Sequence, residues 1–311
     1  MTNARGNQTA AMAAEAVGPL SSEVLSRRFR TPYLVRRLNG RAYVGLTLLG
    51  LAVLAAILAP LLAPHDPELA DITLRLKPPV WSDGGTSTNL LGTDALGRDL
   101  LSRVIFGARI SLSVCLLAVA LAGLVGVTLG LLAGFYGGIV DNVVMRLVDI
   151  MFAFPFLLLA ITWMAIFSPG QRNVVTILVL TGWATFCRMV RGQVLAGRER
   201  EYVMAARVIG ASNGRLIARH ILPNLLATIT VVGTMMLAQF ILAEAALSFL
   251  GLGVEPQTPT WGGLVNEGRE YISTAWWIET FPGLAIVMTV SGIGLLGDWL
   301  RDVFDPRLRV L

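Results

Sequence analysis

The sequence has few charged residues and very few of the residues that build catalytic or metal sites. Only 14% of its 311 residues are charged, and it contains two histidines and two cysteines. Its single lysine lies in LRLKPPV, so the chain lacks the G-x-x-x-x-G-K-[ST] loop that binds nucleotide phosphates. No G-x-S-x-G occurs, and two cysteines are too few for a four-cysteine metal site. These absences predict that the chain is not an enzyme and binds no cofactor of its own.

Long apolar segments dominate what the sequence does contain. Hydrophobic residues make up 55% of the chain, which is typical of a polytopic membrane protein. A bilayer core needs about 20 apolar residues in a helix, and continuous apolar runs favour helices over a barrel with alternating strands. We predict an all-α polytopic membrane protein. Its six transmembrane helices are expected within the uncharged runs 44–63, 110–140, 150–171, 173–187, 221–243 and 280–297.

Basic residues indicate how these helices are oriented, because cytosolic loops carry an excess of Lys and Arg. With both termini cytosolic, 18 of the 25 basic residues lie on the inner side. We therefore expect contact with the lipid bilayer and none with nucleic acid. His65 and His220 then lie on opposite sides, which excludes a two-histidine metal site. The predicted segments are a cytosolic N-terminal segment (1–42), a first transmembrane helix (43–64), an external loop (65–108), a core with five further helices (109–298) and a cytosolic tail (299–311).

Small residues inside the apolar runs are expected to serve packing. Gly126, Gly130 and Gly134 recur at intervals of four, a spacing that lets helix backbones approach closely. A contact with another subunit is the alternative interpretation. Cys115 and Cys187 are expected to be small core residues.

The chain is expected to turn on the inner side over residues 134–147. Arg146 lies at the end of this stretch and Asp149 just beyond it, three residues apart, so one helix face can bring their side chains together. We predict a structural ion pair between them.

Glu244 is the one ionisable residue well inside an apolar run, in ILAEAALSFLGLG. A carboxylate at the centre of a membrane helix costs about 2.5–3.5 kcal/mol on insertion scales, so it should face a cavity or a partner group. One interpretation is a proton or substrate relay. The other is a hydrogen-bonded structural residue near the outer end of its helix.

A small polar module, residues 199–223, separates two apolar runs. EREYVMAARVI has apolar residues at helical spacing, and Gly210 can end this helix in the left-handed conformation. Ser212 can then cap a second short helix through its side chain, and Pro223 is expected to separate that helix from the next span. We predict a helix, a bend and a helix along the inner membrane surface.

The stretch MAARVIGASNGRLIARHILPN resembles the "EAA" loop of ABC-importer permeases, E-A-A, three residues, Gly, nine residues, I-x-L-P. Met204 stands where the family has its acidic residue, with Glu201 one turn earlier, and His220 stands where it has isoleucine. The resemblance implies that this loop couples the spans to an ATPase. The candidate coupling residues are Glu201, Met204, Ala205, Ala206, Arg207, Gly210, Ala211, Ser212, Leu222 and Pro223.

Four further stretches resemble the C-type permease subunit of dipeptide and oligopeptide importers, a family that also contains nickel and glutathione permeases. The similarity covers about residues 38–309, and its stretches are LGTDALGRDLLSRVIFGARISL (91–112), ALSFLGLG (246–253), TPTWGGL (258–264) and GDWLRDVFDPRLR (297–309).

The resemblance implies a type I ABC-importer permease fold in the cytoplasmic (inner) membrane. It implies three kinds of protein partner: a second, B-type permease, two cytosolic ABC ATPases that bind ATP and Mg, and an external solute-binding protein. The implied substrate is a di- or oligopeptide, with nickel or glutathione as alternatives. An ion-gradient-driven secondary transporter is the alternative from another class, although it is expected to show paired intramembrane charges and internal repeats. A non-transporting scaffold or sensor is the third.

Overall fold

The computed structural model describes residues 40–255 and 257–304. The predictions for residues 1–39 and 305–311 therefore lie outside the described residues. Within the described ranges the structure is helical, and its one β-type pairing there is an isolated bridge between Thr93 and Asp99. The all-α prediction is confirmed.

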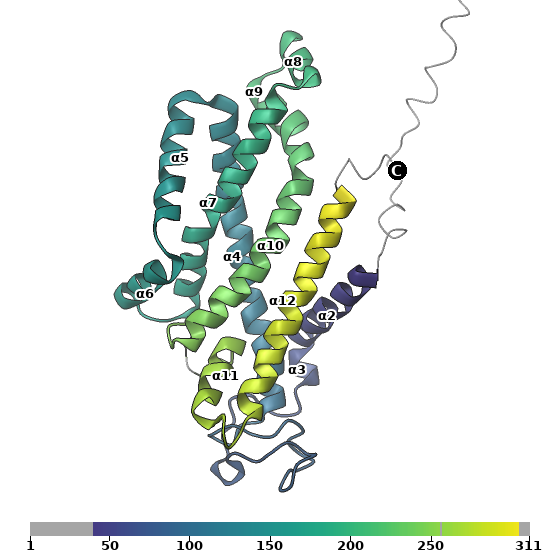
Figure 1. Cartoon of the computed structure of the whole chain (residues 1–311), viewed down its shortest axis with the longest axis vertical. Helices are drawn as coiled ribbons and strands as arrows, with labels where there is room; N and C mark the ends of the chain where they lie inside the picture. The colour runs from purple at the N-terminus through teal and green to yellow at the C-terminus, as the bar shows by residue number, and fades with distance from the viewer. Residues whose placement is uncertain (1–39, 256, 305–311) are drawn as a thin grey trace, which may run out of the picture. The chain divides into compact units, whose positions relative to one another are not determined.

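Five helical segments are long and apolar enough to cross a membrane, and a bent pair adds a sixth if its two helices count as one span. Figure 1 shows them side by side, with α8 at one end of the bundle and α11 at the other. We refer to these as the α8 end and the α11 end. The long helices are α2 (Gly40–Ile57), α4 (Leu100–Tyr136), α7 (Gln171–Arg198), α10 (Leu222–Phe249) and α12 (Trp277–Phe304).

Shorter elements connect these helices. The loop before α4 contains α3 (Ala59–Leu62) and η2 (Ile72–Leu74), and the bent pair is α5 (Gly138–Ala153) and α6 (Phe156–Phe167). The α8 end carries α8 (Glu201–Val208), α9 (Asn213–Arg215) and η3 (Leu216–Ile221). The α11 end carries α11 (Trp261–Gly268) and η4 (Arg269–Tyr271).

Several predicted boundaries differ from the structure because charged residues also join these helices. The first helix starts at Gly40, and α4 starts at Leu100, inside the predicted external loop. The predicted span 173–187 is the middle of the 28-residue α7, and α12 continues through residue 298 to Phe304.

The predicted turn over residues 134–147 is wrong in extent. Helix α4 continues to Tyr136, and the turn is confined to Gly137 and Gly138, which both have positive φ angles of 65° and 57°. Two successive glycines reverse the chain here because that conformation is unfavourable for other residues. Helix α5 then begins at once.

The predicted span 150–171 is not one straight helix, since α5 and α6 meet at an angle of 89° within it. Pro155 disfavours helical geometry at the residue before it, and Phe154 is accordingly extended, with φ −94° and ψ 129°. The bend therefore has a local cause in the sequence.

Helices α4 and α7 pack with their backbones almost touching. A Cβ added at Gly126 would lie 2.3 Å from the Trp183 carbonyl oxygen, and one added at Gly130 would lie 2.6 Å from that of Cys187. Gly134 faces α7 in the same way, at Val194. The packing interpretation of the three glycines is confirmed, and Cys115 and Cys187 are buried as expected.

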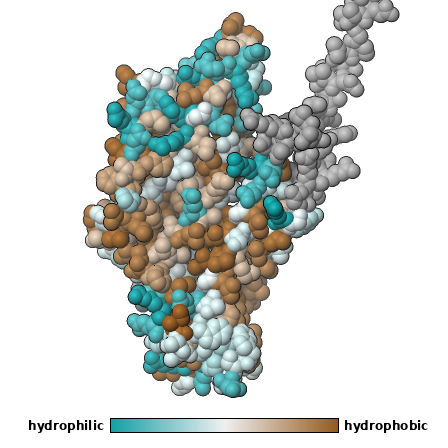
Figure 2. Space-filling model, viewed as in Figure 1, coloured by the Kyte–Doolittle hydropathy of each residue, from teal (hydrophilic) through white to brown (hydrophobic). Residues whose placement is uncertain are grey.

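The surface of the bundle is consistent with a position in a membrane. Figure 2 shows apolar residues across the middle of the visible face and polar residues towards both ends. Exposed leucine, isoleucine and phenylalanine side chains cover α2, α4, α5 and α6. Apolar side chains suit an acyl-chain environment, and the long helices satisfy their own backbone hydrogen bonds there.

Candidate functional site

Helix α8 ends in a Schellman turn that requires glycine. The Gly210 amide donates to the Arg207 carbonyl at 3.0 Å, and the Ala211 amide donates to the Ala206 carbonyl at 3.0 Å. These two bonds satisfy carbonyls that the end of a helix leaves unpaired. Gly210 has a φ angle of 89°, a conformation that residues with a Cβ rarely adopt. The predicted helix end at Gly210 is confirmed.

One face of the 199–223 loop is fixed to the bundle. Val203, Leu216 and Ile221 are buried in one apolar cluster, and Ala206 and Ala211 pack against it. The cluster is completed by residues of α4, α7 and α10, namely Leu131, Phe135, Val190, Val194 and Leu225. A force on α8 would therefore reach three of the long helices directly, because packed interiors deform little.

The opposite face of the loop presents apolar side chains to the surroundings. Val208 and Ile209, just before the glycine turn, are 87% and 86% exposed. Met204 and Tyr202 are exposed on the same helix. An apolar tip beside charged neighbours is typical of a surface that another protein covers.

Ser212 is the N-cap residue of α9, as predicted, but its side chain makes no capping hydrogen bond. The Ser212 carbonyl instead accepts a bond from the Leu216 amide at 3.0 Å. The position was predicted correctly and the hydrogen bond was not.

Pro223 does not separate the second helix from the next span, so that prediction is wrong. Residues 213–249 form one continuous helical segment, and Leu222 is helical with φ −55° and ψ −43°. The reason is the wide π-helical turn of η3, which places Pro223 in the first turn of α10. A missing amide proton is tolerated at the start of a helix.

The candidate coupling residues gather at the α8 end and differ in exposure. Arg207 lies with its guanidinium 5.8 Å from the centre of the Phe135 ring. Three of the ten residues are half-buried, Ala206, Ala211 and Leu222. The exposed residues are Glu201, Met204, Ala205, Arg207, Gly210, Ser212 and Pro223.

Two residues that tie the loop down were not predicted. The Asn224 amide nitrogen donates to the Tyr202 hydroxyl at 3.2 Å and to the His220 carbonyl at 2.6 Å. Arg198 donates to the Gly134 carbonyl at 3.0 Å, joining the end of α7 to the end of α4. Arg198 is a donor at the end of α7, next to carbonyls that the end of α4 leaves unpaired, and that was the available signal. Asn224 lies in the first turn of α10, and no pattern in the sequence pointed to it.

The predicted pair of Arg146 with Asp149 is wrong. Asp149 accepts from Arg188 of α7 at 2.7 Å instead. Asp141, also on α5, accepts two hydrogen bonds from Arg191 of α7. Acidic residues of α5 are thus paired across to α7, since the two helices lie side by side.

Glu244 is completely buried and hydrogen-bonded, as its structural interpretation expects. The Ser248 hydroxyl donates to one carboxylate oxygen at 2.7 Å, and the Ser111 hydroxyl donates to the other at 3.1 Å. Ser111 also accepts from the Trp261 amide at 3.3 Å. The carboxylate therefore joins α4, α10 and α11.

A second polar group at the α11 end, the Arg103 cluster, consists of Asp94, Arg98, Arg103 and Glu267. Arg103 is fully buried, and its Nη1 lies 2.6 Å from the Asp94 carboxylate while its Nη2 lies 2.9 Å from that of Glu267. Arg98 bonds the same two carboxylates at 2.6 and 3.0 Å. No pattern in the sequence predicted this cluster, although three of its members lie in the stretch 91–112.

Three stretches that carried the family resemblance meet at this end. Trp261, from 258–264, donates its indole nitrogen to the Val104 carbonyl, in 91–112, at 3.0 Å. Gly262 is so close to α10 that a Cβ there would lie 2.5 Å from the Ala245 backbone, just before 246–253. Segments distant in sequence thus build one packed cap.

The described residues form a helical bundle of the length and apolarity that a membrane protein needs, with an exposed apolar tip at one end and a packed polar cap at the other. The chain belongs to the family described as binding-protein-dependent transport system inner membrane components, whose match covers residues 126–310. Residues 37–79 match the N-terminal transmembrane domain of oligopeptide transport permease C. The chain is therefore an inner-membrane permease component and not itself an enzyme.

Relatives with curated names are similar over most of their length. The di/tripeptide transport system permease protein DppC of Pseudomonas aeruginosa is 45% identical over 87% of this chain and 89% of its own. The dipeptide permease DppC of Escherichia coli is 45% identical over 87% and 90%. The glutathione transport system permease protein GsiD of Pectobacterium atrosepticum is 42% identical over 83% and 84%. The family decides against a gradient-driven transporter and against a scaffold.

Proposed function

We propose that this chain is the C-type permease of an ATP-driven importer of di- and oligopeptides, and that its 199–223 loop couples it to cytosolic ATPases. The observation that carries the coupling role is the exposure of Val208 and Ile209, at 87% and 86%, beside a turn fixed to three long helices. The basic residues of the sequence support a cytosolic α8 end. The peptide relatives support the substrate class.

In the proposed mechanism the apolar tip enters a groove on an ATPase subunit. Val203, Leu216 and Ile221 then carry the movement of that subunit into α4, α7 and α10. The permease alternates between two states, and the ATPase favours one of them only through contacts that differ between the states. ATP and Mg bind to the partner subunits, and hydrolysis of the ATP supplies the free energy for transport.

The proposal requires three kinds of protein partner. A second, B-type permease completes the pathway, two ABC ATPases bind at the α8 end, and an external solute-binding protein delivers the peptide at the α11 end. The apolar surface of the bundle supports contact with lipid and with the second permease.

Glutathione is the second candidate substrate, because a glutathione permease is 42% identical to this chain. Competition distinguishes the two. The experiment measures uptake of a labelled dipeptide in the presence of competitors. If an excess of unlabelled dipeptides abolishes this uptake and an excess of glutathione does not, the peptide assignment is supported. The reverse pattern overturns it.

The partner set is tested by purifying the tagged chain from its native membranes in mild detergent and identifying what accompanies it by mass spectrometry. We expect a second permease and P-loop ATPases. A cysteine at the exposed Ser212 should also crosslink to an ATPase. A chain that arrives alone, with no crosslinked ATPase, contradicts the proposal.

Gly210 provides the sharpest test of the coupling role. No atom lies within 4 Å of a Cβ added there, so the obstacle to substitution is the backbone conformation alone. A residue with a Cβ pays roughly 1–2 kcal/mol in the left-handed region, whereas asparagine tolerates it better. We expect Gly210→Val to reach the membrane but lose most peptide uptake and ATPase retention in a pull-down.

Gly210→Asn is the matched control, because it adds a side chain of similar size while permitting the turn. It should retain most uptake. Loss of uptake in both variants to the same degree would show that bulk at the tip, and not the turn, matters. Normal uptake in Gly210→Val would contradict the coupling role.

A further inference from the structure

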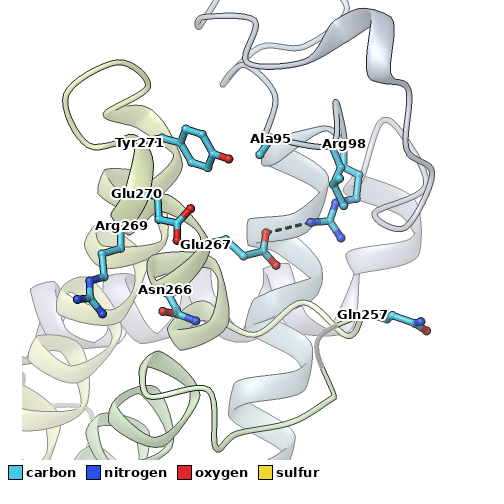
Figure 3. Close-up of a pocket in the computed structure, with 9 residues that line it drawn as sticks. Ala95, Arg98, Gln257, Asn266, Glu267, Arg269, Glu270 and Tyr271 are labelled. Atoms are coloured by element: carbon cyan, nitrogen blue, oxygen red, sulfur yellow. Dashed lines mark hydrogen bonds and ion pairs between the residues drawn. The ribbon is translucent and has the colours of Figure 1, made fainter.

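A charged cavity opens at the α11 end, and the coupling mechanism makes no use of it. It has a volume of about 740 Å³ and lies between the turn at residues 95–98 and the α11–η4 segment. Figure 3 shows its lining side chains. Its charged and aromatic members are Arg98, Glu267, Arg269, Glu270 and Tyr271.

The back wall of the cavity is rigid. Glu267 is held by hydrogen bonds from both Arg98 and Arg103, and Arg103 is fully buried behind it. Arg98 is only 11% exposed and is also bonded to Asp94. These charges are already paired with one another, so they shape the cavity without needing a charged partner from outside.

Glu270 is the carboxylate of the lining that has no partner among the described residues. Within residues 40–255 and 257–304, no ion pair or hydrogen bond occupies its carboxylate, and the residue is exposed. Figure 3 shows Glu270 and Tyr271 directed towards the turn that carries Ala95 and Arg98, while Arg269 is directed away. The Arg269 guanidinium lies 5.9 Å from the Phe249 ring centre. The cavity thus offers a carboxylate and a phenol to an arriving cation.

We propose that this cavity receives a basic side chain, lysine or arginine, from the external solute-binding protein. The inference rests on the proposed function, which places the α11 end outside the cell. A preformed pocket with one free carboxylate directed into it, and with the guanidinium of Arg269 directed away, suits an anchoring basic side chain of a protein partner. Such anchors carry much of the binding energy of an interface. The open carboxylate also favours approach of a positive patch.

The test measures the affinity of the purified solute-binding protein for the whole transporter in lipid nanodiscs, the binding protein being the one that accompanies the wild-type complex. We expect Glu270→Lys to weaken binding by about tenfold or more, because like charges facing each other at an interface cost several kcal/mol. Glu270→Gln should weaken it less and reduce its dependence on salt.

Glu68→Lys is the matched control. It makes the same charge change at an exposed residue of the loop before α4, and Glu68 does not line the cavity. It should retain the wild-type affinity. Equal affinity of Glu270→Lys and Glu68→Lys overturns the docking site.

Two other outcomes are equally decisive. Unchanged binding-protein affinity with a raised KM for peptide in Glu270→Lys would overturn docking and assign the cavity to the peptide itself. Failure of the wild-type transporter to bind any solute-binding protein would count against the proposed function, and not merely against the position of the site.

Discussion

Glu244 lies at the centre of a small buried network, and both of its carboxylate oxygens accept hydrogen bonds from serine hydroxyls. The two serine hydroxyls stabilise the buried carboxylate, and the carboxylate in turn provides each hydroxyl with an acceptor. Removing one member leaves a buried polar group without a bond, which costs about 1–3 kcal/mol. These hydrogen bonds are sufficient to account for an acidic residue within a membrane helix, and a role in transport is not needed to explain it.

The prediction at this residue compares two substitutions. Glu244→Gln keeps a side chain of the same shape that can bond both serines, so it should melt close to the wild-type temperature and retain uptake. Glu244→Leu should lose stability by about 1–3 kcal/mol because Ser111 and Ser248 lose their acceptor. Thermal unfolding of the purified complex gives both values. A Glu244→Gln complex that is fully stable yet inactive in uptake would contradict the structural role.

The α4–α7 pair is the element whose packing the sequence predicted best. Three glycines at intervals of four indicated close approach, and the structure brings their α-carbons against α7 carbonyls and side chains. Close approach lets dispersion contacts accumulate along both helices, which stabilises membrane helix pairs. A methyl group inserted there must separate the backbones.

Gly130→Ala tests this element, with Gly123→Ala as its control on the same helix. The new Cβ would lie 2.6 Å from the Cys187 carbonyl oxygen at position 130, but 3.7 Å from the Phe186 ring at position 123. Overpacking typically costs about 1–3 kcal/mol, so Gly130→Ala should melt lower, while Gly123→Ala should match or exceed the wild type. Equal melting temperatures would show that α4 and α7 can separate freely.

Local sequence rules predicted some turns and failed at others for physical reasons. Gly210 ends α8 as expected, because its backbone conformation depends on the local turn and not on contacts with distant segments. Proline gave opposite results at two places. Pro155 bends the chain at Phe154, whereas Pro223 leaves Leu222 helical because a π-helical turn precedes it. Whether the proline at position 223 interrupts the helix depends on the hydrogen-bond pattern one turn earlier. The spacing of apolar residues in the sequence does not predict that pattern.

Contacts between distant segments were beyond the sequence analysis, and they determine the α11 end. Resemblance identified the stretches 91–112, 246–253 and 258–264 separately. Nothing in their spacing predicted that Arg103 would pair with Glu267, 164 residues away. Charge pairing across that separation depends on how α4, α10, α11 and α12 pack together. The helical class, the 199–223 loop and the family were therefore predictable, while the cap and its cavity were not.

The Arg103 cluster gives a prediction for the whole described bundle, since it ties the loop before α4 to α11. Arg103→Gln should destabilise the complex by roughly 3–5 kcal/mol, the usual cost of removing one partner from a buried ion pair. Arg188→Gln is the control, because Arg188 and its partner Asp149 are 53% and 63% exposed. Exposed pairs contribute roughly 0–1 kcal/mol. Denaturation of both variants under the same conditions measures the difference.

A double substitution shows whether the loss comes from the ion pairs or from a cavity left by the arginine. Arg103→Gln combined with Glu267→Gln places two amides where the charges were, so neither residue leaves an unpaired charge. We expect the double variant to lose less unfolding free energy than the two single variants lose together. The difference should be about 0.5–3 kcal/mol, which is typical of residues in one network. Strict additivity would mean that Arg103 and Glu267 act independently, and that packing alone joins the loop before α4 to α11.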